Sequence, residues 1–178
     1  GYENLLKLVT ISWQQGFYYK PRIDWKRLSE YKEGLLFTSG CLSSAAGDIV
    51  KAGKTIKELK QELQRQKNLL GEHFYIEVVP LTFEPGNKYI EMIYKAAKEL
   101  KLPMVATNDC HYPEQQQSKI QEIMLCIQSN DHMSNPKRWK FDQKDFYLRS
   151  RSEMEQAFKI SHPKLNFTEA LDNTLKIA

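Results

Sequence analysis

Three residues of metal-binding type follow short apolar runs in this sequence. Asp109 and His111 come directly after residues 103–108, and Cys41 comes at the end of residues 34–41. In extended backbone, side chains two positions apart point to the same face, so the carboxylate and the imidazole could converge on one point. These two groups suit zinc, manganese or iron, and a cysteine thiolate would shift the preference towards zinc.

Simpler interpretations of the same residues stay open on spacing alone. An Asp-x-His pair at the end of a strand is more often hydrogen-bonded within a loop, and a buried cysteine such as Cys41 is most often a small apolar filler. Cys110 should point away from its neighbours and pack ordinarily. Glu77 lies between apolar residues and could face the interior as a supporting base, but a lysine or arginine partner is the simpler expectation.

A basic run with an aromatic residue follows later in the chain. Lys137, Arg138 and Lys140 surround Trp139. This combination binds single-stranded nucleic acid by phosphate pairing and base stacking. A solvated loop is the plainer interpretation of the same run. The remaining histidines, among them His132 and His162, are expected in polar loops.

The elements that position these residues alternate between helical and extended patterns. Apolar residues at helical spacing predict helices, and short apolar runs bounded by glycine or proline predict strands. Ser152 and Glu155 predict a capping box at one helix start, and Thr168 could cap the last helix. The predicted helices lie near residues 5–17, 56–70, 90–100, 120–127, 152 onwards and 168–178; the predicted strands are 34–41, 74–79 and 103–108, with an extended segment at 145–149.

This alternation predicts an α/β fold with a mostly parallel sheet covered by helices, either open or closed into a barrel. In both arrangements chemistry collects at the carboxyl ends of the strands. Cys41, Asp109 and His111 are all expected there. No internal repeat or low-complexity linker is present, so one domain over residues 1–178 is the economical interpretation.

Composition limits the classes of protein that fit. The chain has 178 residues, of which 41% are hydrophobic and 27% charged, and no apolar run is long enough to cross a bilayer. The three cysteines form neither a CxxC pair nor a disulfide framework, which favours a reducing cytoplasm. The net charge of +4 permits a nucleic-acid partner without requiring one. No secretory signal is present, and a native N-terminus is expected to be missing, because the chain begins without methionine inside a predicted helix.

Five strings, in order and in register, resemble the PHP domain of the alpha subunit of bacterial DNA polymerase III, a C-family replicative polymerase. The resemblance covers nearly the whole chain. The strings are GFYYKPRID at 16–24, EGLLFTSGCLS at 33–43, VATNDCHY at 105–112, LCIQ at 125–128 and FDQKDFYL at 141–148.

The resemblance implies a distorted seven-stranded (β/α)7 barrel, similar to a TIM barrel, of which this chain is the C-terminal two-thirds or so. It also implies a cluster of divalent metal ions, zinc or manganese, whose ligands would include Cys41, Asp109 and His111. The implied chemistry is metal-dependent phosphoester hydrolysis, acting as a 3′–5′ proofreading exonuclease in the intact protein. The implied partners are DNA, the remainder of the alpha subunit, a proofreading exonuclease subunit and a sliding clamp, in the bacterial cytoplasm and with no membrane.

Three further expectations follow from the resemblance. The family's His-x-His segment and other ligands would lie upstream of residue 1, and the polymerase palm would begin after Ala178, so the isolated chain should have little activity. The family usually has glycine and an acidic residue where this chain has Ser44 and Ala45. A non-catalytic scaffold that braces the polymerase core and docks a separate exonuclease is the main alternative, and a stand-alone phosphatase for small esters ranks last.

Overall fold

The computed structural model describes residues 1–141 and 143–178 as a mixed α/β fold with one small parallel sheet. The sheet has the order β1-β2-β3, with β1 at Phe37–Thr38, β2 at Phe74–Val78 and β3 at Met104–Ala106. Phe37 pairs with Phe74 and Ile76 pairs with Met104, both in parallel register. The predicted α/β class is therefore confirmed, whereas closure into a seven-stranded barrel stays a prediction. Asp142, inside the FDQKDFYL string, lies outside the described residues.

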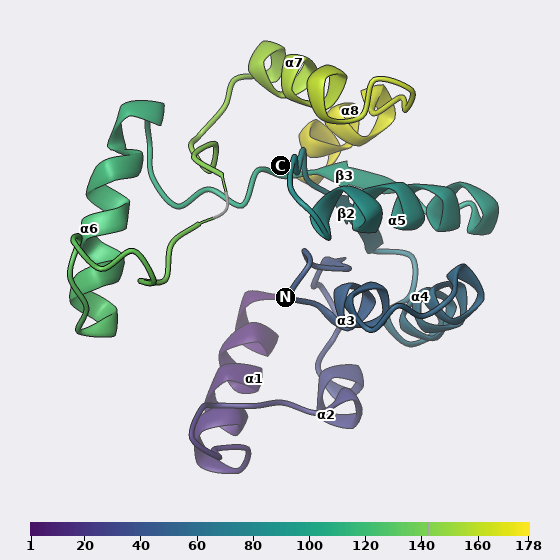
Figure 1. Ribbon diagram of the computed structural model, residues 1–178. Helices are drawn as coiled ribbons and strands as arrows, with labels where there is room; N and C mark the ends of the chain where they lie inside the picture. Colours follow the sequence, from purple (N-terminus) through teal and green to yellow (C-terminus); the bar gives the residue numbers. More distant parts are fainter. Residues whose placement is uncertain (142) are drawn as a thin grey trace.

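Helices make the crossovers between the parallel strands (Figure 1). Two of them, α3 and α4, connect β1 to β2, and α5 connects β2 to β3, as parallel pairing requires. The helices are α1 at Tyr2–Gln14, α2 at Trp25–Glu30, α3 at Ala45–Lys51, α4 at Ile56–Leu70, α5 at Gly86–Leu100, a 3₁₀ turn η1 at Gln115–Gln117, α6 at Ser118–Ser129, α7 at Arg151–Ser161 and α8 at Thr168–Ile177.

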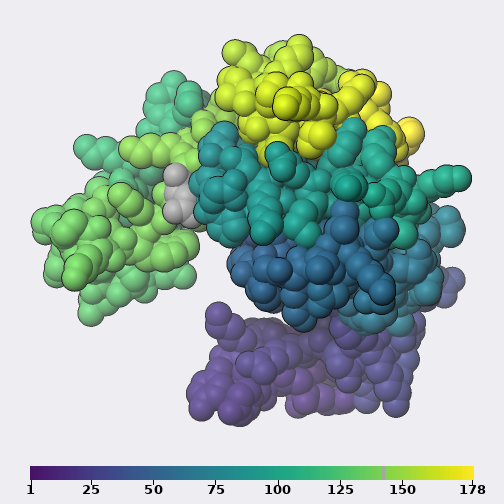
Figure 2. Space-filling view, turned by 45° about the vertical axis from the view of Figure 1, so that its right-hand side comes forward, coloured from purple at the N-terminus to yellow at the C-terminus, as the bar shows by residue number. Residues whose placement is uncertain are grey.

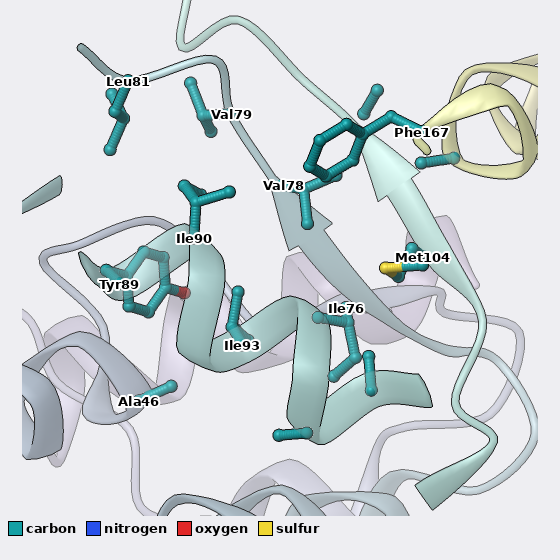
Figure 3. Close-up of a cluster of buried hydrophobic side chains, with 14 of the residues drawn as sticks. Ala46, Ile76, Val78, Val79, Leu81, Tyr89, Ile90, Ile93, Met104 and Phe167 are labelled. Atoms are coloured by element: carbon teal, nitrogen blue, oxygen red, sulfur yellow. The ribbon is translucent and has the colours of Figure 1, made fainter. Parts of the chain in front are cut away.

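The core forms where α5 and α8 pack on the sheet (Figure 3). Alternate residues of β2 are fully buried, and Ile76 and Val78 face the α5 residues Ile90 and Ile93. Burial of these aliphatic side chains is the main favourable contribution to folding here. On β3 all three residues are buried, because α8 covers this strand. The Asn173 amide fixes α8 by donating a hydrogen bond to a β3 carbonyl, that of Met104, over 2.7 Å.

Local signals set the ends of the best-predicted helix, α4. Thr55 and Glu58 form a reciprocal capping box at its start, and Gly71, with a φ of 84°, follows its last residue. A glycine tolerates this backbone conformation at a helix end without the steric cost of a Cβ atom. The predicted bounds of 56–70 are confirmed at both ends.

Two predicted helix caps were wrong, although the predicted start of the last helix at Thr168 is confirmed. The capping box of α7 uses Ser150 and Glu153 rather than Ser152 and Glu155, because Glu155 instead forms an ion pair with Arg151. At α8 no side chain caps the first turn from the expected position. There, the backbone N–H of Thr168 itself donates to Asn166 Oδ1 over 2.9 Å.

All three strands are shorter than their apolar runs. The run at 34–41 contributes only two residues to the sheet, and the run at 103–108 contributes three. The β3 end has a local cause: Asn108 turns its amide towards another segment, and Asp109 has a φ of 47°, which ends extended backbone. Apolar content predicted the location of the strands but not how far their pairing extends.

The helix α6 stands apart from the sheet, as Figures 1 and 2 both show. Residues 131–141 lie with α6, and together they form what we call the α6 lobe. The two segments that lead to and from the lobe are joined by a parallel bridge between Tyr112 and Tyr147 and by the His111 N–H, which donates to the Phe146 carbonyl over 2.8 Å. In the described part of the chain, no helix has the length and apolar character needed to span a bilayer.

Replacing Ile93 with alanine tests the central position of α5. Ile93 is fully buried against β2 in the described core, so Ile93→Ala should lower the free energy of unfolding by about 2–5 kcal/mol through lost burial and a residual cavity. Leu175→Ala, at an α8 residue that is 77% exposed, is the matched control and should change it by less than about 0.5 kcal/mol. Chemical denaturation of the two variants measures the difference, and equal losses would contradict this packing.

Candidate functional site

Asp109 and His111 lie together just beyond the carboxyl end of β3. The distance between Asp109 Oδ1 and His111 Nε2 is 3.5 Å, and both residues are exposed. The predicted convergence is confirmed, but its predicted reason was wrong. Asp109 has a left-handed backbone with a φ of 47°, so the two side chains meet across a turn rather than on one face of a strand.

Two aromatic rings position the His111 imidazole. Its ring centroid lies 4.5 Å from that of Phe141 and 5.8 Å from that of Phe146. The two phenylalanine rings also contact each other, with centroids 5.0 Å apart. Contacts of this kind restrict the orientation of the imidazole while leaving an edge open to solvent.

The buried side chain of Asn108 holds the turn in place. Its Nδ2 donates to the Asp145 carbonyl over 2.8 Å and to the Tyr147 carbonyl over 2.7 Å. Arg149 lies on the same segment and forms an ion pair with Asp145 at 3.1 Å. These bonds join the end of β3 to residues 145–149, which carry Phe146 beside His111.

Cys41 lies in the loop between β1 and α3 and is half-buried. The Tyr89 hydroxyl donates to the Gly40 carbonyl over 2.8 Å. The loop also packs closely on α3, since a Cβ atom at Gly47 would lie 2.0 Å from the Leu42 carbonyl oxygen. The backbone around Cys41 is therefore held in a defined turn by contacts on both sides.

The structure brings two of the three predicted ligands together. Within residues 1–141 and 143–178, no group of three or more His, Cys, Asp or Glu side chains is placed to hold one metal ion. Asp109 and His111 have the right donor atoms and separation to share one, but Cys41 does not join them in such a group. The assignment of all three residues as ligands stays a prediction.

Glu77 links the carboxyl ends of all three strands. Its Oε2 accepts from the Thr38 hydroxyl over 2.7 Å, and its Oε1 accepts from the Thr107 hydroxyl over 2.6 Å. Ser39 Oγ, in turn, accepts from the Glu77 backbone N–H over 2.9 Å. The prediction that Glu77 pairs with a lysine or an arginine was wrong, because the hydroxyls of Thr38 and Thr107 donate to its carboxylate instead. The pattern of hydroxyl residues after β1 and β3 was the signal in the sequence that could have indicated this.

The pKa values of Tyr89 and Cys110 are both raised in this environment. Burial raises the pKa of the Tyr89 phenol well above its ordinary value. Burial also raises the pKa of the Cys110 thiol, and the negative charge of Asp109 adds to the effect. The Cys110 thiol lies 3.3 Å from the Tyr147 carbonyl oxygen, to which it donates. Cys110 is thus a packing and hydrogen-bonding residue, although it is exposed rather than buried.

The basic run lies on the α6 lobe and its members differ in availability. Arg138 forms an ion pair with Glu122 of α6 and donates to the Asn135 carbonyl over 3.1 Å. Its side chain is only 13% exposed. Lys137 and Lys140 are exposed. Nucleic-acid binding by these residues stays a prediction, with Arg138 contributing to the structure of the lobe.

The sequence of this chain is similar to one domain family and to several known proteins. Residues 1–80 match the model of the PHP domain. Over all 178 residues the chain is 35% identical to the DNA polymerase III subunit alpha of Borreliella burgdorferi and 34% identical to that of Treponema pallidum. It is 32% identical to that of Thermus aquaticus.

The chain is similar to DNA polymerase III alpha subunits along its whole length and to the PHP domain over residues 1–80. The resemblance inferred from the five strings is therefore confirmed. The chain spans only about 15% of the length of these curated relatives, so the match concerns one segment of a much longer polypeptide. The predicted extent of the PHP domain over residues 81–178, and a polymerase palm beyond them, stay predictions.

His162, expected from the sequence in a polar loop, is buried. It follows the last residue of α7 and is 4% exposed. Its Nδ1 lies 2.9 Å from Ser161 Oγ, and its Nε2 has no hydrogen-bond partner among the described residues. Burial lowers the pKa of His162 below its ordinary value of 6.5, against the opposing effect of the Asn87 backbone.

The pKa of His162 predicts a pH dependence of stability. Between the lowered pKa and 6.5, the unfolded chain binds a proton that the folded chain does not, so the free energy of unfolding should fall as the pH decreases through this range. His162→Gln should make the curve between about pH 5 and pH 7 shallower. Urea denaturation across this range measures the slopes. His132→Gln, at an exposed histidine, is the matched control, and parallel curves for the wild type and His162→Gln would refute the assignment.

Proposed function

We propose that this chain forms part of the PHP module of a bacterial replicative DNA polymerase. In the intact protein the module hydrolyses the terminal phosphodiester of a primer, which makes it a metal-dependent 3′–5′ proofreading exonuclease. Similarity to three DNA polymerase III alpha subunits over the whole of this chain supports the setting in DNA replication. The Asp109–His111 pair beyond β3 is the observation that carries the chemistry.

Zinc or manganese fits the donor atoms of this pair. Asp109 provides a carboxylate oxygen and His111 an imidazole nitrogen, 3.5 Å apart, and Cys41 is the proposed third ligand from the β1 side. A bound divalent ion supplies a Lewis acid for the phosphate and lowers the pKa of a bound water. Further ligands would come from parts of the longer polypeptide.

Three neighbouring side chains hold the Asp109–His111 pair in its geometry. Phe141 and Phe146 orient the imidazole and shield one side of it from water. Asn108 holds the turn on which both ligands lie. A fixed ligand geometry is what a metal-dependent hydrolase needs from its surrounding shell. The carboxyl edge of a parallel sheet is also where α/β proteins place their active sites.

A non-catalytic scaffold is the second candidate function, and two observations favour it. Among the described residues no three-ligand group is assembled. The outer face of α6 also exposes a stripe of apolar residues at helical spacing, as a docking helix does. The stripe comprises Ile120, Ile123, Met124 and Ile127, whose exposures run from 41% to 69%.

The partners that we propose follow from the polymerase setting. They are DNA, the remainder of the alpha subunit, a separate proofreading exonuclease subunit and a sliding clamp, all in the bacterial cytoplasm. We further propose that the three-stranded sheet is part of the distorted (β/α)7 barrel of PHP domains, with its remaining strands supplied by the longer polypeptide.

The double variant Asp109→Asn with His111→Ala distinguishes the two functions. In the full-length protein it should lose bound zinc or manganese, measured by elemental analysis, and lower 3′-end trimming by about 100-fold, because two metal ligands are removed. Primer extension should be retained, which shows that the protein is folded. Asp48→Asn with His73→Ala, at two exposed positions away from the pair, is the matched control.

Two results would favour the scaffold. One is a wild-type protein without metal, and the other is trimming that the double variant leaves unchanged. Cys41→Ala tests the third ligand separately and should lower the metal content without removing Asp109 or His111. Hydrolysis of mononucleotides or sugar phosphates without any action on DNA ends would instead indicate a small-ester phosphatase.

A further inference from the structure

Two neighbouring cavities lie between the α6 lobe and the segments next to it. Both are bounded by Leu125 of α6 and by Phe141, so one ring and one aliphatic side chain separate them. The first has a volume of about 390 Å³ and contains the side chains of the basic segment. The second has a volume of about 450 Å³ and contains His111 and Trp139.

The first cavity is rich in cations and hydrogen-bond donors. Arg138, Lys140 and Lys144 line it, and Glu122, the acidic residue among its described lining residues, already pairs with Arg138. The Ser118 side chain also lines it. Lysine ammonium groups form charge-assisted hydrogen bonds with a phosphate.

Two buried donors at this cavity have no acceptor within the described residues. The Gln143 side-chain oxygen accepts from the N–H and the hydroxyl of Thr82, at 3.1 and 3.0 Å, which fixes the orientation of its amide. Gln143 Nε2 is then left without a partner, as is Arg138 Nε, and Gln143 is only 8% exposed. Buried donors of this kind are nearly always satisfied, so their presence here indicates a place for an acceptor.

The second cavity has the character of a base-binding site. Trp139 is 59% exposed, and its ring centroid lies 5.3 Å from that of Phe141. Gln121 and Gln128 of α6 line the same cavity and offer amide donors and acceptors. Exposed aromatic faces stack on bases with little sequence preference, and neutral amides can pair with their edges.

We propose that the two cavities together bind one nucleotide unit of single-stranded DNA, with its phosphate in the first and its base in the second. Because Leu125 and Phe141 line both cavities, a phosphate in the first and a base in the second lie next to each other, as they do within one nucleotide. His111 lines the base cavity, so the bound nucleotide lies beside the Asp109–His111 pair. The inference rests on the proposed function only in assigning the bound nucleotide to the phosphodiester that is hydrolysed. Binding of the nucleotide by these residues requires no metal.

Photo-crosslinking tests this site in the full-length protein. The probe is 5-iodo-2′-deoxyuridine 5′-monophosphate in excess chelator, and the readout is crosslinking to the peptide that carries Trp139 and Phe141. This readout separates the site from the nucleotide site of the polymerase. Lys140→Gln with Lys144→Gln should raise the half-saturating concentration by about tenfold or more, because charge-assisted hydrogen bonds to the phosphate are lost.

The matched control is Lys57→Gln with Lys119→Gln, which removes the same charge at exposed lysines that do not line the first cavity. It should change the half-saturating concentration by less than about twofold. The nucleoside without its phosphate should bind the wild type as weakly as the nucleotide binds the Lys140/Lys144 variant. No crosslink to this peptide, or equal losses in the two lysine variants, would overturn the proposal.

Asp109→Asn separates this inference from the proposed function. The variant should keep nucleotide crosslinking in chelator and lose 3′-end trimming in metal. Trimming that survives the loss of both Lys140 and Lys144 undiminished would refute a nucleotide site that serves this reaction. Crosslinking to the wild-type protein, if that protein shows no trimming in metal, would refute the hydrolase while supporting the binding site.

Discussion

The amide of Asn108 is the contact on which the arrangement of this molecule depends. It lies just past β3, and its two hydrogen bonds reach the carbonyls of Asp145 and Tyr147, almost forty residues later. Through them the sheet, which is held by a large apolar core, determines where the return segment from the α6 lobe runs. The position of Phe146 against His111 and the left-handed turn at Asp109 both follow from this connection. A buried amide with both hydrogens bonded is costly to displace, so the connection is stiff.

The region around the sheet and the α6 lobe differ in their composition. The sheet with α4, α5 and α8 contains most of the buried aliphatic residues and provides the stability. The α6 lobe has few buried residues, Leu125 and Cys126 among them, and its apolar stripe faces outward. The two cavities at the lobe are instead lined by cationic, amide and aromatic side chains. Functional residues commonly lie on such connecting segments, where a rigid sheet holds them in place.

Local sequence signals predicted the elements well, and long-range partners escaped prediction. The Thr55–Glu58 box and Gly71 are adjacent to α4, so its bounds were readable from the sequence. The Asp109–His111 convergence was predicted with a wrong backbone reason, because nothing in the sequence revealed that β3 would end at Ala106 and that Asp109 would adopt a left-handed backbone. The Arg138–Glu122 pair and the burial of His162 depend on segments that meet only in the folded chain, and propensity carries no information on such meetings. The resemblance to a family was inferred from strings of residues, and neither the local signals nor the long-range contacts contributed to it.

The hydroxyl bonds of Glu77 have a consequence for which side chains this position accepts. Both carboxylate oxygens act as acceptors, one for each flanking strand. A glutamine has the same shape but offers one oxygen and one NH₂ group, so one of Thr38 and Thr107 would have to reverse its role from donor to acceptor. An aspartate keeps both oxygens but is one methylene too short to reach across two strand spacings. The carboxyl edge of the sheet therefore selects glutamate by charge and by length together, independently of any metal.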